Sequence, residues 1–257
     1  MKLRVWQTTK QTYDVFFSNL GLFFKTAWAW MIGTYVFLSI FHVIRQSSVE
    51  LLIANWVVLA FAGTSVAIVW HRAILLGTRP AASIYLRFGR REFRFLLISL
   101  IISGVIFGPT IIGTILTITG SGGSASIGGL MAIGFLYFIV ASFVAFRFAL
   151  LYPATAIENR EITVRTSWRF TTGNTFRFYF GALLSLGPFA LAAQLVSKGK
   201  QQLLVTSEGF ALVIGVELIS WMLSFAQIAV AAAYLSHAYK FFVEERNLRL
   251  PVTGPSD

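Results

Sequence analysis

The chain of 257 residues contains no cysteine. Disulfide bonds, thiolate nucleophiles and cysteine-ligated metals are therefore excluded as features of this chain. Charge is also scarce, because Asp, Glu, Lys and Arg make up 12% of the residues, whereas a soluble domain carries about 25%. This shortage of charged residues argues against an ordinary soluble domain.

A second absence is that of any recognisable catalytic or metal-binding motif. The three histidines, His42, His71 and His237, show no ligand spacing of the HExxH kind. The sequence also has no evident pair of nucleophile and base. We therefore predict no enzymatic activity, no metal site and no cofactor.

Long apolar runs are what the sequence does contain. Hydrophobic residues account for 56% of the chain, and the mean hydropathy is +0.74. Runs of about 20 apolar residues cross the hydrocarbon core as α-helices. Since no linker-like stretch divides the chain, we predict a single all-α domain over residues 1–257, a polytopic membrane bundle of six transmembrane helices. The predicted spans are about Leu20–Ile44, Leu51–Leu76, Phe93–Thr119, Leu130–Leu151, Phe176–Val196 and Gly209–Leu235.

The basic residues alternate between the two sides of these spans. Of the 21 Lys and Arg residues, 17 lie on one side, in residues 1–25, 71–94, 152–177 and 237–257. The opposite loops hold Arg45, Lys198 and Lys200. Cytoplasmic loops of membrane proteins are enriched in this way, so we expect both termini to be cytoplasmic. The net charge of +11 then reflects topology, and we predict no nucleic-acid partner.

The first 19 residues combine polar and aromatic side chains. For residues 3–19 we predict a short helix at the membrane interface, with Trp6, Tyr13, Phe16 and Phe17 toward lipid. We see no convincing signal-peptide cleavage site after Lys2 and Arg4, so this segment is expected to remain part of the protein.

Two further stretches on the basic side have the character of amphipathic helices. A helix is predicted from Ala81, and it places several arginines on one face, opposite apolar residues. Residues 158–177 repeat the pattern. Such faces attract anionic lipid head groups or the acidic surface of a partner protein, although arginines at span ends also serve simply to set topology. The candidate binding residues are Arg87, Arg90, Arg91, Arg94, Arg165 and Arg169.

Few polar residues fall inside the predicted spans. Glu217 is the one acidic residue there, and Gln227 lies deeper in the same span. An intramembrane carboxylate is a candidate ion or proton site. Glu217, however, is only about 10 Å from the outer end of its span, so reaching out to the interface is an alternative role. Arg147, at the basic end of the fourth span, is expected to extend toward the head groups.

Small residues and prolines interrupt two spans. Gly104 and Gly108 form a GxxxG pattern, which predicts close helix packing. Pro109 and Pro188 break the third and fifth spans at corresponding places. Broken helices in corresponding positions are typical of transporter sites, and packing kinks are the alternative.

A weak internal repeat accompanies these interruptions. Phe93-Arg94-Phe95 recurs as Phe176-Arg177-Phe178, each at the start of a span. Tyr13 and Asn19 match Trp168 and Asn174 in spacing. A unit of one interfacial helix and a two-span hairpin, present three times in parallel, would produce these spacings.

Residues 156–184 read AIENREITVRTSWRFTTGNTFRFYFGALL. A Ser167-Trp168 helix, then Gly173-Asn174 and an aromatic-rich span, resembles a pattern of bacterial six-span membrane proteins. These include the YciC-like family and the membrane domain attached to some glycerophosphodiester phosphodiesterases. The resemblance implies a bacterial inner-membrane location and six spans, and it implies no activity.

Two functional hypotheses follow. The first is a non-enzymatic multi-pass membrane protein that organises the membrane, binding lipids, especially anionic ones, or a protein partner through its basic cytoplasmic helices. The second is a small transporter or permease with a site between the third, fifth and sixth spans. The second requires polar groups that converge at mid-membrane, and the sequence offers few of them.

Overall fold

The computed structural model describes residues 2–44, 48–81, 88–119, 127–205 and 210–244, and every regular element in these ranges is a helix. The elements are α1 (Val5–Ser18), α2 (Leu20–Ile44), α3 (Ser48–Leu76), α4 (Arg90–Thr119), α5 (Ile127–Phe146), α6 (Leu151–Ala156), α7 (Val164–Thr171), α8 (Thr175–Val205), α9 (Phe210–Tyr239) and the π-helix η1 (Lys240–Glu244). The all-helical prediction is confirmed for this part of the chain.

Several of these helices are suited to a membrane. Four stretches of the described residues are long and apolar enough to cross it, and a fifth is added if α1 and α2 count as one span, bent by 71°. The four stretches are Ile53–Leu76, Arg90–Pro109, Thr175–Gln202 and Ile214–Val243.

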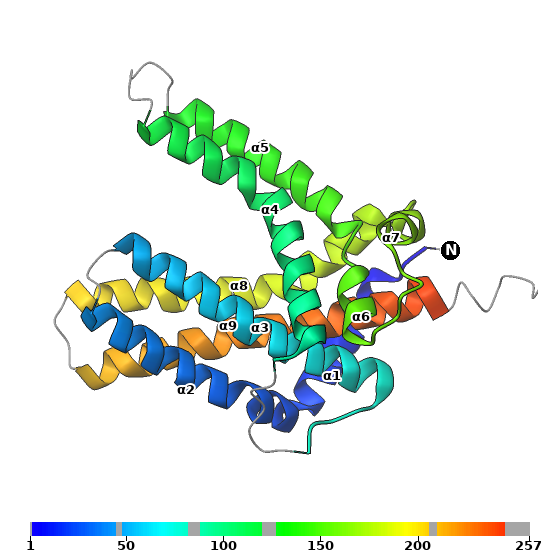
Figure 1. Ribbon diagram of the computed structural model, residues 1–257, viewed down its shortest axis with the longest axis horizontal. Helices are drawn as coiled ribbons and strands as arrows, with labels where there is room; N and C mark the ends of the chain where they lie inside the picture. The colour runs from blue at the N-terminus through cyan, green and yellow to red at the C-terminus, as the bar shows by residue number, and fades with distance from the viewer. Residues whose placement is uncertain (1, 45–47, 82–87, 120–126, 206–209, 245–257) are drawn as a thin grey trace, which may run out of the picture.

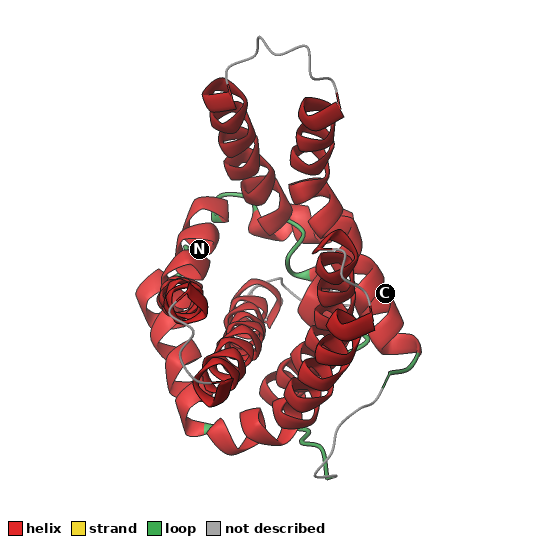
Figure 2. Cartoon of the chain, turned by 90° about the vertical axis from the view of Figure 1, so that its left-hand side faces the viewer, coloured by secondary structure: helices red, strands yellow, loops and turns green. Residues whose placement is uncertain are grey.

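The long helices form a bundle with one hairpin that leaves it. Figure 1 shows α2, α3, α8 and α9 side by side, while α4 and α5 run away from them as a pair. Figure 2, turned by 90°, shows the same hairpin standing clear of the other helices. The short elements α1, α6, α7 and η1 gather at the end of the bundle where this hairpin joins it (Figure 1). We call this end the arginine-rich end, because Arg72, Arg94, Arg160, Arg165 and Arg169 belong to it.

Helix α1 packs into the bundle along α8 and α9. Its buried side chains are Thr8, Thr9, Thr12 and Phe16. Phe16 is 3% exposed and packs against the rings of Trp70 and Phe189, whereas the next residue, Phe17, is 58% exposed. The prediction that Phe16 faces lipid was therefore wrong. Trp6 and Phe17 are the aromatic residues of α1 that point outward.

Two long helices contain a proline, and each proline is compensated by a tyrosine from a neighbouring helix. Pro188 has no N–H to donate to the carbonyl of Leu184. The Tyr13 hydroxyl on α1 lies 2.8 Å from that oxygen and 2.9 Å from the carbonyl oxygen of Ser185. In the same way, the Tyr137 hydroxyl on α5 donates to the carbonyl of Val105, which Pro109 leaves without a partner on α4. Both helices therefore continue through their prolines.

The closest helix approaches occur at glycines other than the predicted pair. A Cβ on Gly181 of α8 would clash with the hydroxyl of Tyr234 on α9. That hydroxyl donates to the carbonyl of Phe178 at 2.6 Å, so the α8–α9 contact depends on the missing side chain. A Cβ added at Gly104 or Gly108 would have no atom of another described element within 4 Å, so the structure does not show the predicted close packing at GxxxG.

Two short helices meet long ones at asparagines. Asn19 separates α1 from α2, and Asn174 separates α7 from α8. The side-chain oxygen of Asn19 accepts a hydrogen bond from Arg79, and that of Asn174 accepts one from the backbone N–H of Leu3. Both side chains thereby connect a helix joint to a segment that is distant in the sequence.

The largest differences from the predicted span boundaries are at the ends of α8 and α5. Helix α8 continues to Val205, so Lys198 and Lys200 are helical and do not belong to a polar loop. Helix α5 ends at Phe146, and the chain then turns through residues 147–150 into α6. In this turn the Arg147 carbonyl accepts a hydrogen bond from the Ser167 hydroxyl at 2.7 Å.

Candidate functional site

Three of the four arginines predicted between residues 81 and 94 belong to the start of α4. Phe88 and Gly89 are not helical, and α4 begins at Arg90, so one continuous amphipathic helix over this stretch was a wrong prediction. Arg90, Arg91 and Arg94 project from the first turns of the long helix itself. Arg87 lies outside the described residues.

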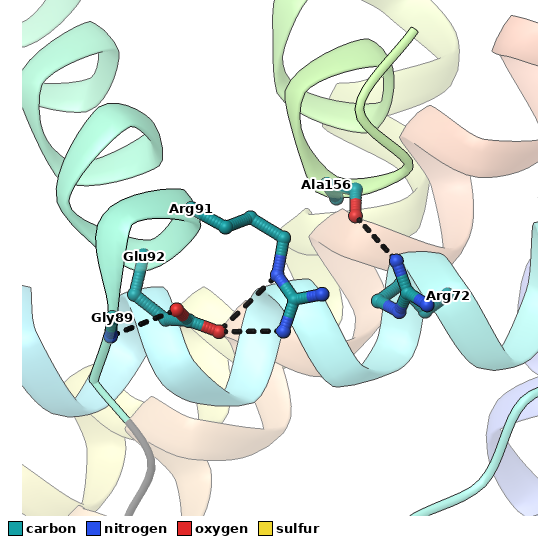
Figure 3. Close-up of polar contacts among 5 residues, drawn as sticks. All are labelled: Arg72, Gly89, Arg91, Glu92 and Ala156. Carbon is teal, nitrogen blue, oxygen red and sulfur yellow. Dashed lines mark hydrogen bonds and ion pairs between the residues drawn. The ribbon is translucent and has the colours of Figure 1, made fainter.

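Glu92 explains why α4 begins where it does. Its carboxylate accepts the backbone N–H of Gly89 at 2.9 Å, as the third residue of a helix does in a capping box. The same carboxylate receives Nε and Nη2 of Arg91, at 3.2 and 2.7 Å, so the ion pair is held by two hydrogen bonds (Figure 3). Glu92 is buried, and Arg91 supplies the positive charge that a buried carboxylate needs.

The end of α6 and the side chain of Arg72 lie near this ion pair. Figure 3 shows the guanidinium of Arg91 on one side and that of Arg72, from α3, on the other. Arg72 donates to the carbonyl of Ala156, the last residue of α6, over 3.4 Å. Nearby, burial raises the pKa of Tyr152 to about 12, although a hydrogen bond with Ser99 acts in the opposite direction. Its phenol is therefore neutral at any physiological pH.

A cleft of about 410 Å³ lies between the first turns of α4 and the chain around α6, and we call it the α4–α6 cleft. Its polar lining comes from three arginines, one glutamate, a threonine and an asparagine, and four aliphatic residues complete it. The lining residues are Arg91, Arg94, Leu97, Ile98, Leu151, Thr155, Glu158, Asn159, Arg160 and Ile162.

The remaining predicted arginines lie elsewhere. Arg165 and Arg169 are exposed on α7, and the guanidinium of Arg169 lies 5.6 Å from the ring of Phe170. Neither residue lines the α4–α6 cleft. The structure thus brings Arg91 and Arg94 together with Arg160, and it separates them from the pair on α7.

The sequence motif on α7 has a structural role in this fold. Ser167 binds the carbonyl of Arg147, and the ring of Trp168 lies 4.0 Å under the Arg147 guanidinium, which also donates to Thr172 at 2.9 Å. Gly173 has a φ of 81°, a conformation that favours glycine, and Asn174 follows it. Ser167, Trp168 and Thr172 thus connect the α7 region to Arg147, just after the end of α5. Arg147 is held by these contacts and does not extend freely toward head groups.

The proposed intramembrane residues are not close to one another. Glu217 forms an ion pair with Lys200, at the end of the bundle opposite the arginine-rich end. Gln227 is ten residues further along α9, about 15 Å away, and is half-buried. Glu217 and Gln227 therefore do not form a common polar site.

The histidines do not form a metal centre in the part of the chain that the structure describes, where no group of three potential His, Cys, Asp or Glu ligands is present. His71 is buried, and its Nδ1 lies 2.8 Å from the hydroxyl of Ser236, which joins α3 to α9. This contact accounts for His71 as a packing residue.

Comparisons with protein-family models, with curated proteins and with solved structures found no match. The function is therefore inferred from the geometry of the molecule.

Four charged residues of the candidate site were missed by the sequence analysis, namely Arg72, Glu92, Glu158 and Arg160. Glu92 could have been recognised from its spacing to Gly89, because a carboxylate three residues after a helix cap is a known capping signal. Arg72 and Arg160 have no such signal. Their proximity to the start of α4 results from the packing of α3 and α6 against α4.

Proposed function

We propose that the protein is a non-enzymatic, multi-pass, membrane-organising protein of the bacterial inner membrane that binds anionic lipids, or alternatively a protein partner, at its arginine-rich end. The observation that carries this proposal is a set of exposed arginines without acidic partners. Arg90, Arg94, Arg160 and Arg165 are exposed, and none of them forms an ion pair within the described ranges. Each basic residue near an anionic leaflet contributes about 1 kcal/mol to binding.

The same proposal includes six spans and a cytoplasmic arginine-rich end. The spans would be α2, α3, α4, α5, α8 and α9. Helix α5 has 20 residues, and a helix of that length reaches about 30 Å, the thickness of the hydrocarbon core. Basic residues concentrate on the cytoplasmic side of bacterial membrane proteins, which supports this orientation. The likeness of residues 156–184 to the YciC-like proteins supports the same location.

We extend the proposal to a repeated unit of one short helix and a two-span hairpin. Its support is the similarity of the two asparagine joints. The backbone N–H of Phe23 donates to the carbonyl of Asn19, and that of Phe178 donates to the carbonyl of Asn174. A helix preceding α4 in the middle unit would fall in residues 82–87, which lie outside the described residues.

The proposal is tested by purifying the full-length protein in mild detergent and identifying the lipids and proteins that remain bound. We expect anionic phospholipids to be enriched over their share of the source membrane, and the enrichment to fall as salt is raised, because exposed charges are screened. A bound-lipid composition equal to that of the source membrane would contradict lipid binding. A stoichiometric protein partner without lipid enrichment would favour the partner-binding form of the proposal.

The transporter hypothesis is less well supported. It requires the third span to lie beside the fifth and sixth, but α4 packs chiefly against α3, α5 and α6. The carboxylate of Glu217 is neutralised by Lys200. We therefore expect Glu217→Gln to leave any ion flux through reconstituted protein unchanged. Loss of a measured flux in Glu217→Gln, with expression intact, would instead make the transporter the leading function.

A further inference from the structure

The α4–α6 cleft has a charge that suits one particular class of anion. Because Glu92 neutralises Arg91 through two hydrogen bonds, the charges left facing the cleft are those of Arg94, Arg160 and Glu158. Arg94 and Arg160 are exposed and have no hydrogen-bond or ion-pair partner in the described residues. The cleft therefore presents one net positive charge, which matches the single negative charge of a phosphodiester.

The start of α4 does not itself provide this site. Its cap is occupied by Glu92, which already accepts the N–H of Gly89. Binding must rely on the side chains of Arg94 and Arg160, whose planar guanidinium groups suit two phosphate oxygens each.

The cleft also has an apolar side that continues along α4. Leu97 lines the cleft and is 48% exposed, and Ile101 and Val105, one and two turns further on the same face, are 59% and 46% exposed. An acyl chain can follow this stripe away from the arginines. A water-soluble phosphate ester has no apolar chain to pack against this stripe.

Glu158 gives the cleft a hydrogen-bond acceptor. It occupies the left-handed position after α6, with a φ of 61°, where glycine is the usual residue. The backbone N–H groups of Glu158 and Asn159 close the helix end by donating to Thr155 and Ala154, at 3.2 and 2.8 Å. A carboxylate in the same cleft as these two arginines can accept a hydrogen bond from a hydroxyl group, but it repels a second negative charge on a phosphate.

We propose that the α4–α6 cleft binds one anionic glycerophospholipid with a hydroxyl-bearing head group, of the phosphatidylglycerol kind. The phosphodiester lies between Arg94 and Arg160, a head-group hydroxyl donates to Glu158, and one acyl chain follows Leu97 and Ile101. This inference rests on the proposed function and deepens it, because it converts a general attraction to anionic lipid into one defined site.

The test uses full-length protein in detergent, titrated separately with phosphatidylglycerol, phosphatidylethanolamine and phosphatidic acid, with bound lipids counted by native mass spectrometry. We expect one phosphatidylglycerol to bind more tightly than those that follow. Arg94→Gln with Arg160→Gln should weaken that first binding at least about tenfold. The matched control is Arg165→Gln with Arg169→Gln, which removes the same charge from exposed positions outside the cleft and should weaken it less than about twofold.

The remaining arms separate the alternatives. Glu158→Gln should reduce the preference for phosphatidylglycerol over phosphatidic acid, because it removes the repulsion of a second phosphate charge. Glycerol phosphate without acyl chains should not compete, and effective competition by it would overturn the lipid assignment. If the Arg94/Arg160 double variant does not fold, Arg160→Gln alone, in the segment after α6, carries the test.

Two outcomes distinguish this inference from the proposed function. Equal weakening by the two double variants would overturn the cleft site, while general binding of anionic lipid at the arginine-rich end would stand. Equal binding of all three lipids to the unmodified protein would overturn both.

Discussion

At the residue scale, single hydroxyl groups maintain the two long helices that contain proline, α4 and α8. A proline in a helix leaves the carbonyl four residues earlier without its donor, and such a carbonyl is costly where water is absent. Tyr13 and Tyr137 supply the missing donors from neighbouring helices. The prolines are therefore explained by packing, and they do not require a transport site.

Tyr13 and Pro188 should therefore be energetically coupled, because both act on the Leu184 carbonyl. Tyr13→Phe should destabilise the protein by about 1–3 kcal/mol, because the Leu184 carbonyl loses its donor. In a Pro188→Ala background the new N–H can serve that carbonyl, so the same change should cost less. Thermal or chemical unfolding of the four proteins in detergent measures the coupling. Equal cost of Tyr13→Phe in both backgrounds would show that the hydroxyl does not replace the missing backbone bond.

At the scale of elements, α1 is part of the bundle. Its buried face consists of three threonines and one phenylalanine, and two of the threonines, Thr8 and Thr12, bond to backbone carbonyls four residues earlier. These compact side chains allow α1 to lie close to α8 and α9. The helix is therefore held by packing along much of its length, in addition to any contact with lipid.

The neighbouring residues Phe16 and Phe17 provide a matched test of this arrangement. Phe16→Ala should cost about 3 kcal/mol in the free energy of unfolding, because it leaves a cavity beside Trp70 and Phe189. Phe17→Ala should change it by less than about 0.5 kcal/mol, since Phe17 is mostly exposed. Both values follow from denaturation in detergent micelles. Similar small effects of the two changes would mean that α1 lies at the surface.

At the scale of the whole molecule, charge is divided between the two ends of the bundle. Both the N-terminal segment and η1 lie at the arginine-rich end (Figure 1). The opposite end contains the ion pair of Lys200 and Glu217, whose charges cancel. An uneven distribution of this kind orients a membrane protein with its basic end in the cytoplasm.

We expect reporter fusions to place both termini on the cytoplasmic side. A fluorescent protein that matures in the cytoplasm should be bright after Met1 or Asp257, whereas alkaline phosphatase at either position should be inactive. A fusion within the Thr119–Gly129 segment should give the reverse result. Active phosphatase at Asp257 would overturn the orientation, and with it the assignment of the arginines to the cytoplasmic leaflet.

Much of the fold was predictable because hydropathy acts locally. The run of apolar residues placed α2 at Leu20–Ile44, as observed, and put the end of α3 at Leu76. The same signal misplaced the ends of α5 and α8. Near those ends Ser167 donates to the Arg147 carbonyl and Lys200 pairs with Glu217, and both contacts join parts of the chain that are distant in the sequence.

The candidate site was predictable in part for the same reason. Arg91 and Arg94 were identified because arginines beside an apolar run signal a membrane interface. Arg160 was not, because nothing near it in the sequence reveals that it shares a cleft with Arg94. Residues 158–162 come close to α4 because the chain turns after α5 and α6 packs against α4, and this packing cannot be read from the local sequence.

The sequence by itself determined that this protein is helical and rich in apolar segments. It also determined that positive charge is concentrated in every second stretch between those segments. These properties follow from composition and residue order, because apolar segments partition into hydrocarbon and charged segments into water whatever tertiary contacts form. The tertiary structure decided which side chains meet, such as Phe16 with Trp70 and Tyr13 with the Leu184 carbonyl, and it decided that Arg94 and Arg160 line one cleft. Such pairs depend on the rotation and crossing of whole helices, and adjacent residues on one helix point about 100° apart.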